Sequence, residues 1–251
     1  MILPKPEDAL HKMQLYRLLG EMLDEPMVAQ QVYFKGETCA TMLGFLDRFS
    51  LDLDFDLADK AKKKIIAQKL QEIFKKLDFQ VKQKSLKELF YVLKYQSLGG
   101  MRNTLKLSLL GKTAQANTYS PFYLKEIDRY AICQTIETMF AHKLVSPIDR
   151  FKKYQMIAGR DIYDIHHFFL QGYGYNQKVI EERTRKDALS YLKEVKEFIE
   201  EKINEKILSQ ELNYLLPYEK FKKIRKILKR ETILLLTDEI KRLSFLKPSD
   251  I

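Results

Sequence analysis

The chain has 251 residues and a formal net charge of +10, with 45% hydrophobic and 31% charged residues. This composition excludes a disordered chain, and the length suits one large domain or two modest ones. The surplus of lysine and arginine favours polyanionic partners such as nucleotides and nucleic acids, although a lysine-rich genome produces the same bias.

No apolar run reaches the ~18 residues of a membrane-spanning helix. The start, MILPKPEDALHKM, lacks a basic region followed by an apolar core, so we expect no secretory signal. Cys39 and Cys133 are flanked by apolar or small residues, which favours buried thiols over a disulfide or a zinc site. These features predict a cytoplasmic protein without membrane contact.

The N-terminal half is predicted to combine helices and strands. Thr38 is expected to cap a short helix that ends near Gly44. Strict alternation of polar and apolar residues predicts a strand from Ser50 to Asp56. The other expected elements are helices at 7–23 and 58–77 and strands at 32–34, 79–81, 89–95 and 105–110.

From about residue 124 the pattern is almost wholly helical. Pro147, the segment Gly172-Tyr173-Gly174 and Pro217 are expected to break it into helices at 130–147, 160–171, 176–206 and 218–243. We therefore predict an α+β fold, in which residues 1–118 form a mixed sheet with helices and residues 119–251 form a helical domain.

The acidic strand is the first candidate for chemistry. Side chains two apart share a strand face, so Asp52, Asp54 and Asp56 lie on one side and apolar residues on the other. Carboxylates this close repel each other unless a cation lies between them, and an all-oxygen ligand set favours Mg²⁺ or Mn²⁺. The alternative is an exposed acidic face without a ligand.

The residues before this strand distinguish the two interpretations. Lys35 and Gly36 stand at a predicted strand-to-helix turn, where free backbone N–H groups can receive a phosphate. The segment FKGETCATMLGFLDRFSLDLDFD, with Arg48-x-Ser50-x-Asp52-x-Asp54, resembles the AbiEii/AbiGii toxin family. That resemblance implies a nucleotidyltransferase-like sheet.

A second constellation lies downstream. Ala141-His142-Lys143 and Arg160-Asp161-Ile162-Tyr163-Asp164 resemble two further motifs of the same family. Taken alone, Asp161 and Asp164 are favourable charges in the first turn of a helix, and Lys143 is a surface residue. By the resemblance, Lys143 contacts the nucleotide phosphates, Asp161 completes the catalytic site, and residues 119–251 supply both.

The resemblance implies a metal-dependent nucleotidyltransferase that moves an NMP group from an NTP to an acceptor, such as tRNA or another RNA. It also implies a toxin of a toxin–antitoxin or phage-defence system, neutralised by an antitoxin from a neighbouring gene. Asp52 and Asp54 would hold Mg²⁺ (or Mn²⁺), and Lys143 and Asp161 would join them as catalytic residues. The implied nucleotide-binding residues are Lys35, Gly36, Thr38, Arg48, Ser50 and Lys143.

Two departures from the family pattern keep alternatives open. Glu37 replaces a glycine of the turn, and Ser108 stands where the fold usually has a third carboxylate. They favour a diverged nucleic-acid- or partner-binding module as the second interpretation; a phosphotransferase that moves a γ-phosphoryl group is the third. Asp56 or Glu37 could replace the missing carboxylate.

Two further features, a pair of adjacent histidines and a basic segment, are better explained by structure than by function. His166 and His167 point about 100° apart on a helix, so one is expected in the core and the other in solvent. The segment 218–230 has seven cationic residues and one acidic residue, which predicts a surface helix with a solvated basic face. The functional alternative for that face is RNA guidance.

Overall fold

The computed structural model describes residues 1–85, 87–111 and 114–246. These residues form two compact units. Unit 1 is built from the described residues of 1–113 and 117–135, and unit 2 from those of 114–116 and 136–251. Within the described ranges, no helix combines the length and the apolar character needed to cross a membrane.

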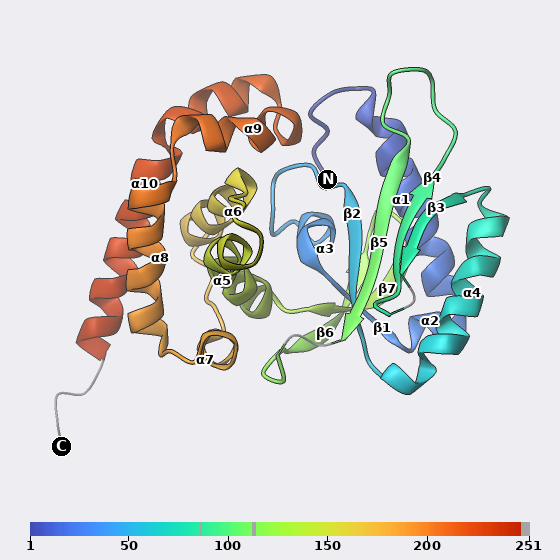
Figure 1. Ribbon diagram of the computed structural model, residues 1–251, viewed down its shortest axis with the longest axis horizontal. Coiled ribbons are helices and arrows are strands. Elements are labelled where there is room, and N and C mark those ends of the chain that lie inside the picture. Colours follow the sequence, from blue (N-terminus) through green and yellow to red (C-terminus); the bar gives the residue numbers. More distant parts are fainter. Residues whose placement is uncertain (86, 112–113, 247–251) are drawn as a thin grey trace. The chain divides into compact units, whose positions relative to one another are not determined.

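Unit 1 is an α+β unit in which helices and strands are mixed up to α4, followed by five consecutive strands (Figure 1). Its elements are α1 (Asp8–Asp24), α2 (Pro26–Ala29), β1 (Val32–Lys35), α3 (Gly36–Met42), β2 (Asp52–Leu57), the 3-10 turn η1 (Lys60–Lys62), α4 (Lys63–Lys76), β3 (Gln80–Ser85), β4 (Phe90–Lys94), β5 (Thr104–Gly111), β6 (Tyr119–Leu124) and β7 (Arg129–Gln134).

The seven strands form one mixed sheet in the order β3-β4-β5-β2-β1-β7-β6. The pairs β2–β5 and β1–β7 are parallel, and the other neighbouring pairs are antiparallel. Strand β2 therefore lies near the middle of the sheet, with a strand hydrogen-bonded on each side. This central place makes the side-chain direction of every β2 residue well determined.

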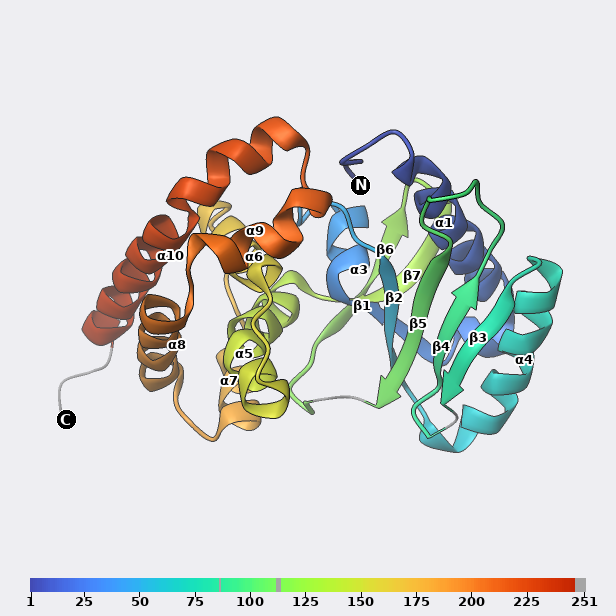
Figure 2. The ribbon, with the colours of Figure 1, turned by 45° about the horizontal axis from the view of Figure 1, so that its top comes forward.

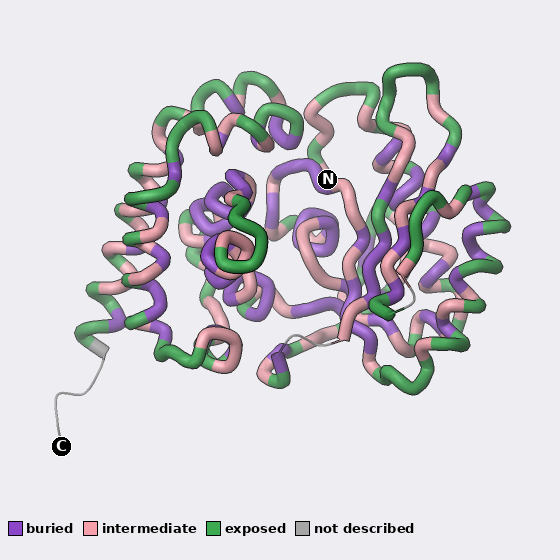
Figure 3. The backbone as a smooth tube through the Cα atoms, viewed as in Figure 1, coloured by how far each residue is buried: buried purple, intermediate pink, exposed green. Residues whose placement is uncertain are grey.

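One face of the sheet carries the core of unit 1. Leu53 and Phe55 of β2, both 0% exposed, point to this face, and Phe55 stacks on Phe34 of β1 at 5.0 Å between ring centroids. Phe74 of α4 packs edge-on against Tyr91 of β4 at 5.1 Å. Figures 1 and 2 show α1 and α4 along this side, and Figure 3 shows the buried strands.

Unit 2 is helical. Its elements are α5 (Ile136–Tyr154), α6 (Gly159–Leu170), α7 (Gln177–Thr184), α8 (Ala188–Lys202), α9 (Glu205–Leu215) and α10 (Tyr218–Leu246). Helix α10 packs on α6, α8 and α9, and α5 packs on α6, α7 and α8. The short segment 114–116 joins this unit because Glu182 of α7 accepts hydrogen bonds from the N–H groups of Gln115 and Ala116 at 2.7 and 2.9 Å.

The fold class is confirmed, but the prediction of a helix over 130–147 is wrong for its first five residues, which belong to β7. Strand β6 was also missed. In β7, Ala131 and Cys133 are buried while Tyr130 and Ile132 are exposed, a period-two pattern. The spacing of these apolar residues also fits a helix. The structure shows a strand, in which Cys133 is the register partner of Phe34 of β1.

The helix expected at 176–206 is three helices, α7, α8 and part of α9. Arg185 takes a left-handed conformation with φ of 61°, and the side chains of Asp187 and Asn204 cap the next two helices. Asp and Asn are preferred N-cap residues, so these two positions could have indicated the helix starts from the sequence. Pro147 does not end α5, which continues to Tyr154, because Leu144, Val145 and Ile148 are buried around it.

The division into units differs from the expected domain boundary at residue 118, because β6 and β7 belong to unit 1. Strand β7 pairs with β1, about a hundred residues earlier in the chain, and β6 joins the sheet through its hairpin with β7, so the local pattern did not indicate their place in unit 1. That residues 119–251 complete the active site stays a prediction.

Candidate active site

The carboxylates of Asp52, Asp54 and Asp56 project from one face of β2, as the alternation predicted. Asp52 and Asp54 are partly exposed, whereas Asp56 is 0% exposed. The first two side chains are therefore open to a ligand from solvent. Residues Ser50 and Leu51, expected in the strand, lie just before it.

Gly36 places its backbone against the Asp54 carboxylate. It has a φ of +77°, and a Cβ atom on it would lie 3.0 Å from Asp54 Oδ2. The strand pairing explains this approach, since Lys35 of β1 is the register partner of Asp54. Only glycine combines this conformation with such a close backbone approach at little cost. Gly36 therefore leaves space beside one of the two exposed carboxylates.

Thr38 and Ser50 are buried and connect α3 to the start of β2. The Thr38 hydroxyl donates to the Asp52 carbonyl at 2.5 Å and lies 2.8 Å from the Ser50 hydroxyl. The expected N-cap role of Thr38 is wrong, since α3 begins at Gly36 and Lys35 is its N-cap. The contact instead holds the backbone of Asp52. The predicted nucleotide contacts of both residues stay predictions.

Arg48 is 0% exposed and links α3 to the segment that precedes β2. Its Nη2 lies 2.8 Å from Glu37 Oε2, and its Nη1 donates to the Phe49 carbonyl at 2.9 Å. The carboxylate of Glu37, which departs from the family pattern, is therefore paired with a guanidinium. This pairing reduces the repulsion that an isolated carboxylate exerts on a phosphate.

The buried carboxylate of Asp56 accepts hydrogen bonds from three side chains of neighbouring strands. Lys35 Nζ, the Tyr119 hydroxyl and Gln134 Nε2 lie 2.6, 2.7 and 2.8 Å from its carboxylate oxygens. Burial and the adjacent Asp56 raise the pKa of Tyr119, so its hydroxyl stays protonated and donates. Asp56 is thus bound by three donors, which argues against its service as a replacement metal ligand. Tyr119 and Gln134 were not predicted.

Ser108 of β5 is the register partner of Asp54 in the parallel pair β2–β5. Paired residues of neighbouring strands point to the same face, so the Ser108 hydroxyl lies beside the acidic positions. Position 108, where a third carboxylate was expected, therefore lies next to Asp54 in the sheet as predicted, but it holds the neutral side chain of serine. Within β2 and β5, the exposed acidic side chains are Asp52 and Asp54.

Asp52 and Asp54 fit a hard divalent cation. They offer carboxylate oxygens from adjacent same-face positions, and the missing side chain of Gly36 leaves room on one side of Asp54. Mg²⁺ takes one or two protein carboxylates and fills its other positions with water and substrate phosphate oxygens. Asp52 and Asp54 would hold such an ion, and it would supply charge to neutralise phosphate oxygens.

In unit 2, Lys143 of α5 and Asp161 of α6 form a direct ion pair. Lys143 Nζ lies 3.1 Å from Asp161 Oδ1 and 2.7 Å from Asp164 Oδ2, and both carboxylates are 0% exposed. Arg150 Nε adds a contact of 3.2 Å to Asp161 Oδ2. The surface role considered for Lys143 is wrong, because its side chain is 13% exposed and its ammonium contacts both aspartates.

Arg150 was missed by the sequence analysis, although it stands seven residues after Lys143 and therefore on the same face of α5. Gly159 was also missed. A Cβ atom there would lie 2.8 Å from Leu208 Cα, so this glycine permits close packing of α6 on α9. Its neighbour Arg160 pairs with Glu211 at 2.5 Å.

The expectation for the adjacent histidines is confirmed for the first of them. His166 is 3% exposed and its Nε2 lies 2.8 Å from Glu231 Oε2 of α10. His167 is partly exposed and stacks on Tyr163 at 6.2 Å between ring centroids. The two cysteines are buried free thiols, as predicted.

Comparison with known families gives one match over most of the chain. The model of the family described as "Nucleotidyl transferase AbiEii toxin, Type IV TA system" matches residues 17–234. These residues include every position named above as a candidate catalytic, metal-binding or nucleotide-binding residue. No curated protein sequence matches the chain.

Two crystal structures from Helicobacter pylori have a similar fold. One, described as a candidate nucleotidyltransferase, has a TM-score of 0.61 at 19% identity, over 98% of this chain and 100% of the other. The second, JHP933, has a TM-score of 0.55 at 20% identity, again over 98% and 100%. At these identities the likeness supports the fold alone.

Proposed function

Because the chain belongs to the AbiEii nucleotidyl transferase toxin family, we propose that it transfers an NMP group from an NTP to a hydroxyl of an RNA acceptor, with Asp52 and Asp54 as ligands of Mg²⁺ (or Mn²⁺). The observation that carries this proposal is the pair of partly exposed carboxylates on one face of β2, beside the backbone of Gly36. Two such carboxylates match the metal ligands of phosphoryl-transfer sites.

In the proposed reaction an RNA hydroxyl oxygen attacks the α-phosphorus of the NTP. The bond from that phosphorus to the α–β bridging oxygen breaks, and pyrophosphate and a proton are released. Most of the catalysis is positioning and charge neutralisation, since phosphoryl transfer needs little covalent chemistry from the protein. Lys143 and Asp161 act as the further catalytic residues in this proposal, on the strength of their match to the family motifs.

The parts of unit 1 around β2 have a positioning role in the same proposal. The Thr38 hydroxyl holds the Asp52 carbonyl, and Arg48 holds Glu37 at the start of α3. These buried contacts restrict the position of the acidic pair relative to the N-terminus of α3. A rigid metal site lowers the reorganisation needed in the transition state.

The experiment is incubation of the pure protein with each radiolabelled NTP, Mg²⁺ and total RNA. We expect RNA labelled from the α-phosphate of one or more NTPs, and loss of labelling on chelation of Mg²⁺ or in Asp52→Ala. Asp238→Ala is a matched control, because Asp238 is an exposed aspartate of α10. Full labelling or full toxicity of Asp52→Ala would exclude the metal site.

Ser108 supports a second candidate, a nucleic-acid- or partner-binding module on a diverged transferase scaffold. Its hydroxyl replaces a carboxylate next to Asp54 in the sheet. Titration of the protein with each NTP separates the two functions. NTP affinity that rises with Mg²⁺ supports the transferase, and affinity for RNA without metal-dependent NTP binding supports the module.

Partners and location follow from the first proposal. The family implies an antitoxin from the same operon and an NTP substrate; tRNA or another RNA as acceptor, phage defence and a cytoplasmic location remain predictions. Co-expression with the neighbouring gene, scored by bacterial growth, tests the antitoxin. Sequencing of RNA 3′ ends from growing and arrested cells identifies the acceptor.

A further inference from the structure

Strands β3, β4 and β5 leave one polar face open beside the acidic strand. Lys106 of β5 is the register partner of Asp52 and is exposed. Lys94 of β4 pairs with Thr104, two residues before Lys106, so the two lysines and Asp52 share a sheet face. The opposite face of β4 and β5 is buried through Tyr91, Leu93 and Leu107.

Charge separates sharply between these strands and β2. Strand β2 carries three aspartates, whereas β3, β4 and β5 together carry lysines and no acidic residue. Lys94 and Lys106 lie on the open face, whereas Lys84 is the register partner of the buried Tyr91 and points to the opposite face. A polyanion that reaches the acidic strand with a metal ion would therefore find positive charge on the neighbouring strands.

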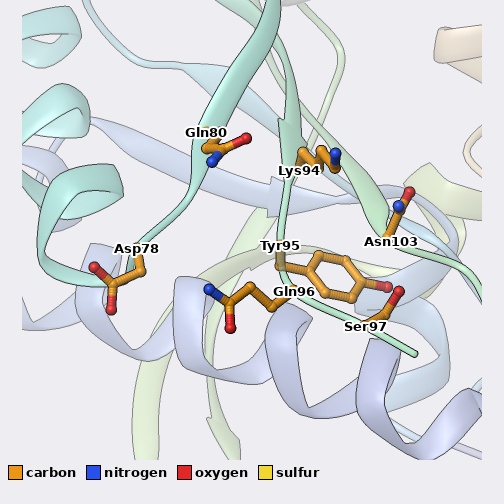
Figure 4. A pocket seen from close by; sticks show the side chains of 7 residues that line it. All are labelled: Asp78, Gln80, Lys94, Tyr95, Gln96, Ser97 and Asn103. Carbon is orange, nitrogen blue, oxygen red and sulfur yellow. The ribbon is translucent and has the colours of Figure 1, made fainter. Parts of the chain in front are cut away.

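A polar hollow of about 420 Å³ lies at the end of this face, where β4 ends and β3 and β5 begin. Figure 4 shows its side chains, which include Gln80, Lys94, Ser97 and Asn103 and the carboxylate of Asp78. These amides, hydroxyl and ammonium offer both donors and acceptors, the groups that read the edges of an unstacked base. The volume suits a small ligand such as one nucleotide.

We propose that this open face binds the single-stranded end of the acceptor RNA, with phosphates on Lys94 and Lys106 and one unpaired nucleotide in the hollow. Neighbouring strands are ~4.8 Å apart, so the hollow lies ~10–15 Å across the sheet from β2. A few nucleotides of an extended strand cover this distance. The inference rests on the proposed function, since it names the path of the acceptor to the same metal site.

The side chains on this face favour RNA over a protein partner. The exposed residues of this face are Gln80, Gln83 and Lys106, and Lys94, Thr104, Phe90 and Val92 are partly exposed. Protein interfaces have apolar cores depleted in lysine. Single-stranded nucleic acid is bound by lysine-lined grooves with polar contacts to unstacked bases.

The test is the affinity of the full chain for a fluorescein-labelled 12-nucleotide single-stranded RNA, measured over a series of salt concentrations. For Lys94→Gln/Lys106→Gln we expect ~10- to 100-fold weaker binding and a salt slope reduced by about two. Lys64→Gln/Lys75→Gln removes the same charge from exposed residues of α4, and its affinity should stay within about twofold of wild type. Equal losses in both pairs would overturn the proposal.

The hollow is tested separately by Gln80→Ala/Asn103→Ala, with no change of charge. We expect weaker binding of the single strand, unchanged salt slope, and unchanged affinity for ATP with Mg²⁺. Loss of ATP affinity with normal RNA affinity would instead make the hollow part of the NTP site and overturn the inference. Weaker binding of a 12-base-pair RNA duplex than of the single strand is also required.

The two proposals fail separately. If wild type labels RNA from an NTP but the lysine pair binds RNA normally, the acceptor path is wrong and the transferase stands. If no labelling occurs but RNA binding depends on Lys94 and Lys106, the RNA surface stands and the transferase fails.

Discussion

At the scale of single residues, Gly36 and the Asp54 carboxylate depend on each other. The positive φ of Gly36 turns the chain from β1 into α3, and its missing side chain leaves the space beside Asp54. The tight turn and the space beside Asp54 therefore both depend on glycine at this position. A second glycine of unit 1, Gly44, has a similar φ of +79° with no atom within 4 Å of the Cβ position.

This contrast gives a matched pair of variants. Gly36→Ala and Gly44→Ala should each lower the free energy of unfolding by about 1–2 kcal/mol, because alanine is strained at positive φ. Only Gly36→Ala should also lower NTP-dependent labelling of RNA, by more than about tenfold, because its Cβ displaces Asp54. Urea unfolding and labelling assays measure the two effects. Equal activity losses would contradict this role of Gly36.

His11 of α1 is a buried titratable residue close to the start of the acidic strand. Its Nε2 lies 2.9 Å from the Leu51 carbonyl, and its Nδ1 lies 2.7 Å from the Tyr95 hydroxyl. Burial lowers the pKa of His11 from 6.5 to about 4. The neutral ring therefore holds the backbone one residue before Asp52.

The lowered pKa predicts loss of stability in acid. Above pH 6.5 the ring is neutral in both states, so its contacts contribute fully. As the pH falls from 6.5 to about 4, the unfolded chain takes up a proton that the folded protein does not, and stability falls by ~3 kcal/mol. His11→Gln should lack this component, so the stability difference between wild type and variant shrinks as the pH falls. A constant difference in urea unfolding would contradict the prediction.

At the scale of elements, the Asp56 network joins four strands of the sheet. Lys35, Tyr119 and Gln134 come from β1, β6 and β7 and meet on a carboxylate of β2. These four strands are consecutive in the sheet, and β6 is its edge strand. The network therefore stabilises the sheet on the side of β2 opposite to β5.

Asp56→Asn should destabilise the protein by roughly 3 kcal/mol, since it leaves the ammonium of Lys35 without its buried carboxylate. Lys35→Met/Asp56→Leu should recover part of this loss, because no buried charge remains. Thermal unfolding measures both, with Glu88→Gln as an exposed control. The Mg²⁺ concentration for half-maximal labelling should stay unchanged in the folded fraction of Asp56→Asn. A marked rise would identify Asp56 as a metal ligand.

At the scale of the whole molecule, candidate catalytic residues are shared between two units. Asp52 and Asp54 belong to unit 1, and Lys143 and Asp161 belong to unit 2. If both pairs serve one reaction, the effects of their substitutions on the rate are not additive, because removing one member of a catalytic unit already removes most of its contribution.

We therefore expect Asp52→Asn and Lys143→Gln each to slow single-turnover labelling by about 100-fold or more, and the double variant to be close to the slower single one. Circular dichroism must show that each variant is folded, because Lys143 pairs with two buried carboxylates. Losses that multiply in the double variant would contradict a joint role.

Local sequence determined the elements with strong periodicity and the positions of the candidate residues. The alternation from Ser50 to Asp56 is enough to place three carboxylates on one strand face, because side-chain direction in a strand follows from spacing alone. The helical periods of α1, α4 and α6 were recognisable for the same reason. The family motifs around Gly36, Asp52 and Asp161 indicated the function that the matched family supports.

Only the tertiary structure decided which of these carboxylates are partly exposed and which is buried. Asp56 has the same local pattern as Asp54, yet side-chain donors from β1, β6 and β7 surround it. Strand β7 was mistaken for helix because its apolar residues fit both periods, and its pairing with β1, about a hundred residues earlier in the chain, lies beyond the reach of local pattern. Register likewise placed Ser108 beside Asp54, and burial separates the partly exposed Asp52 and Asp54 from Asp56.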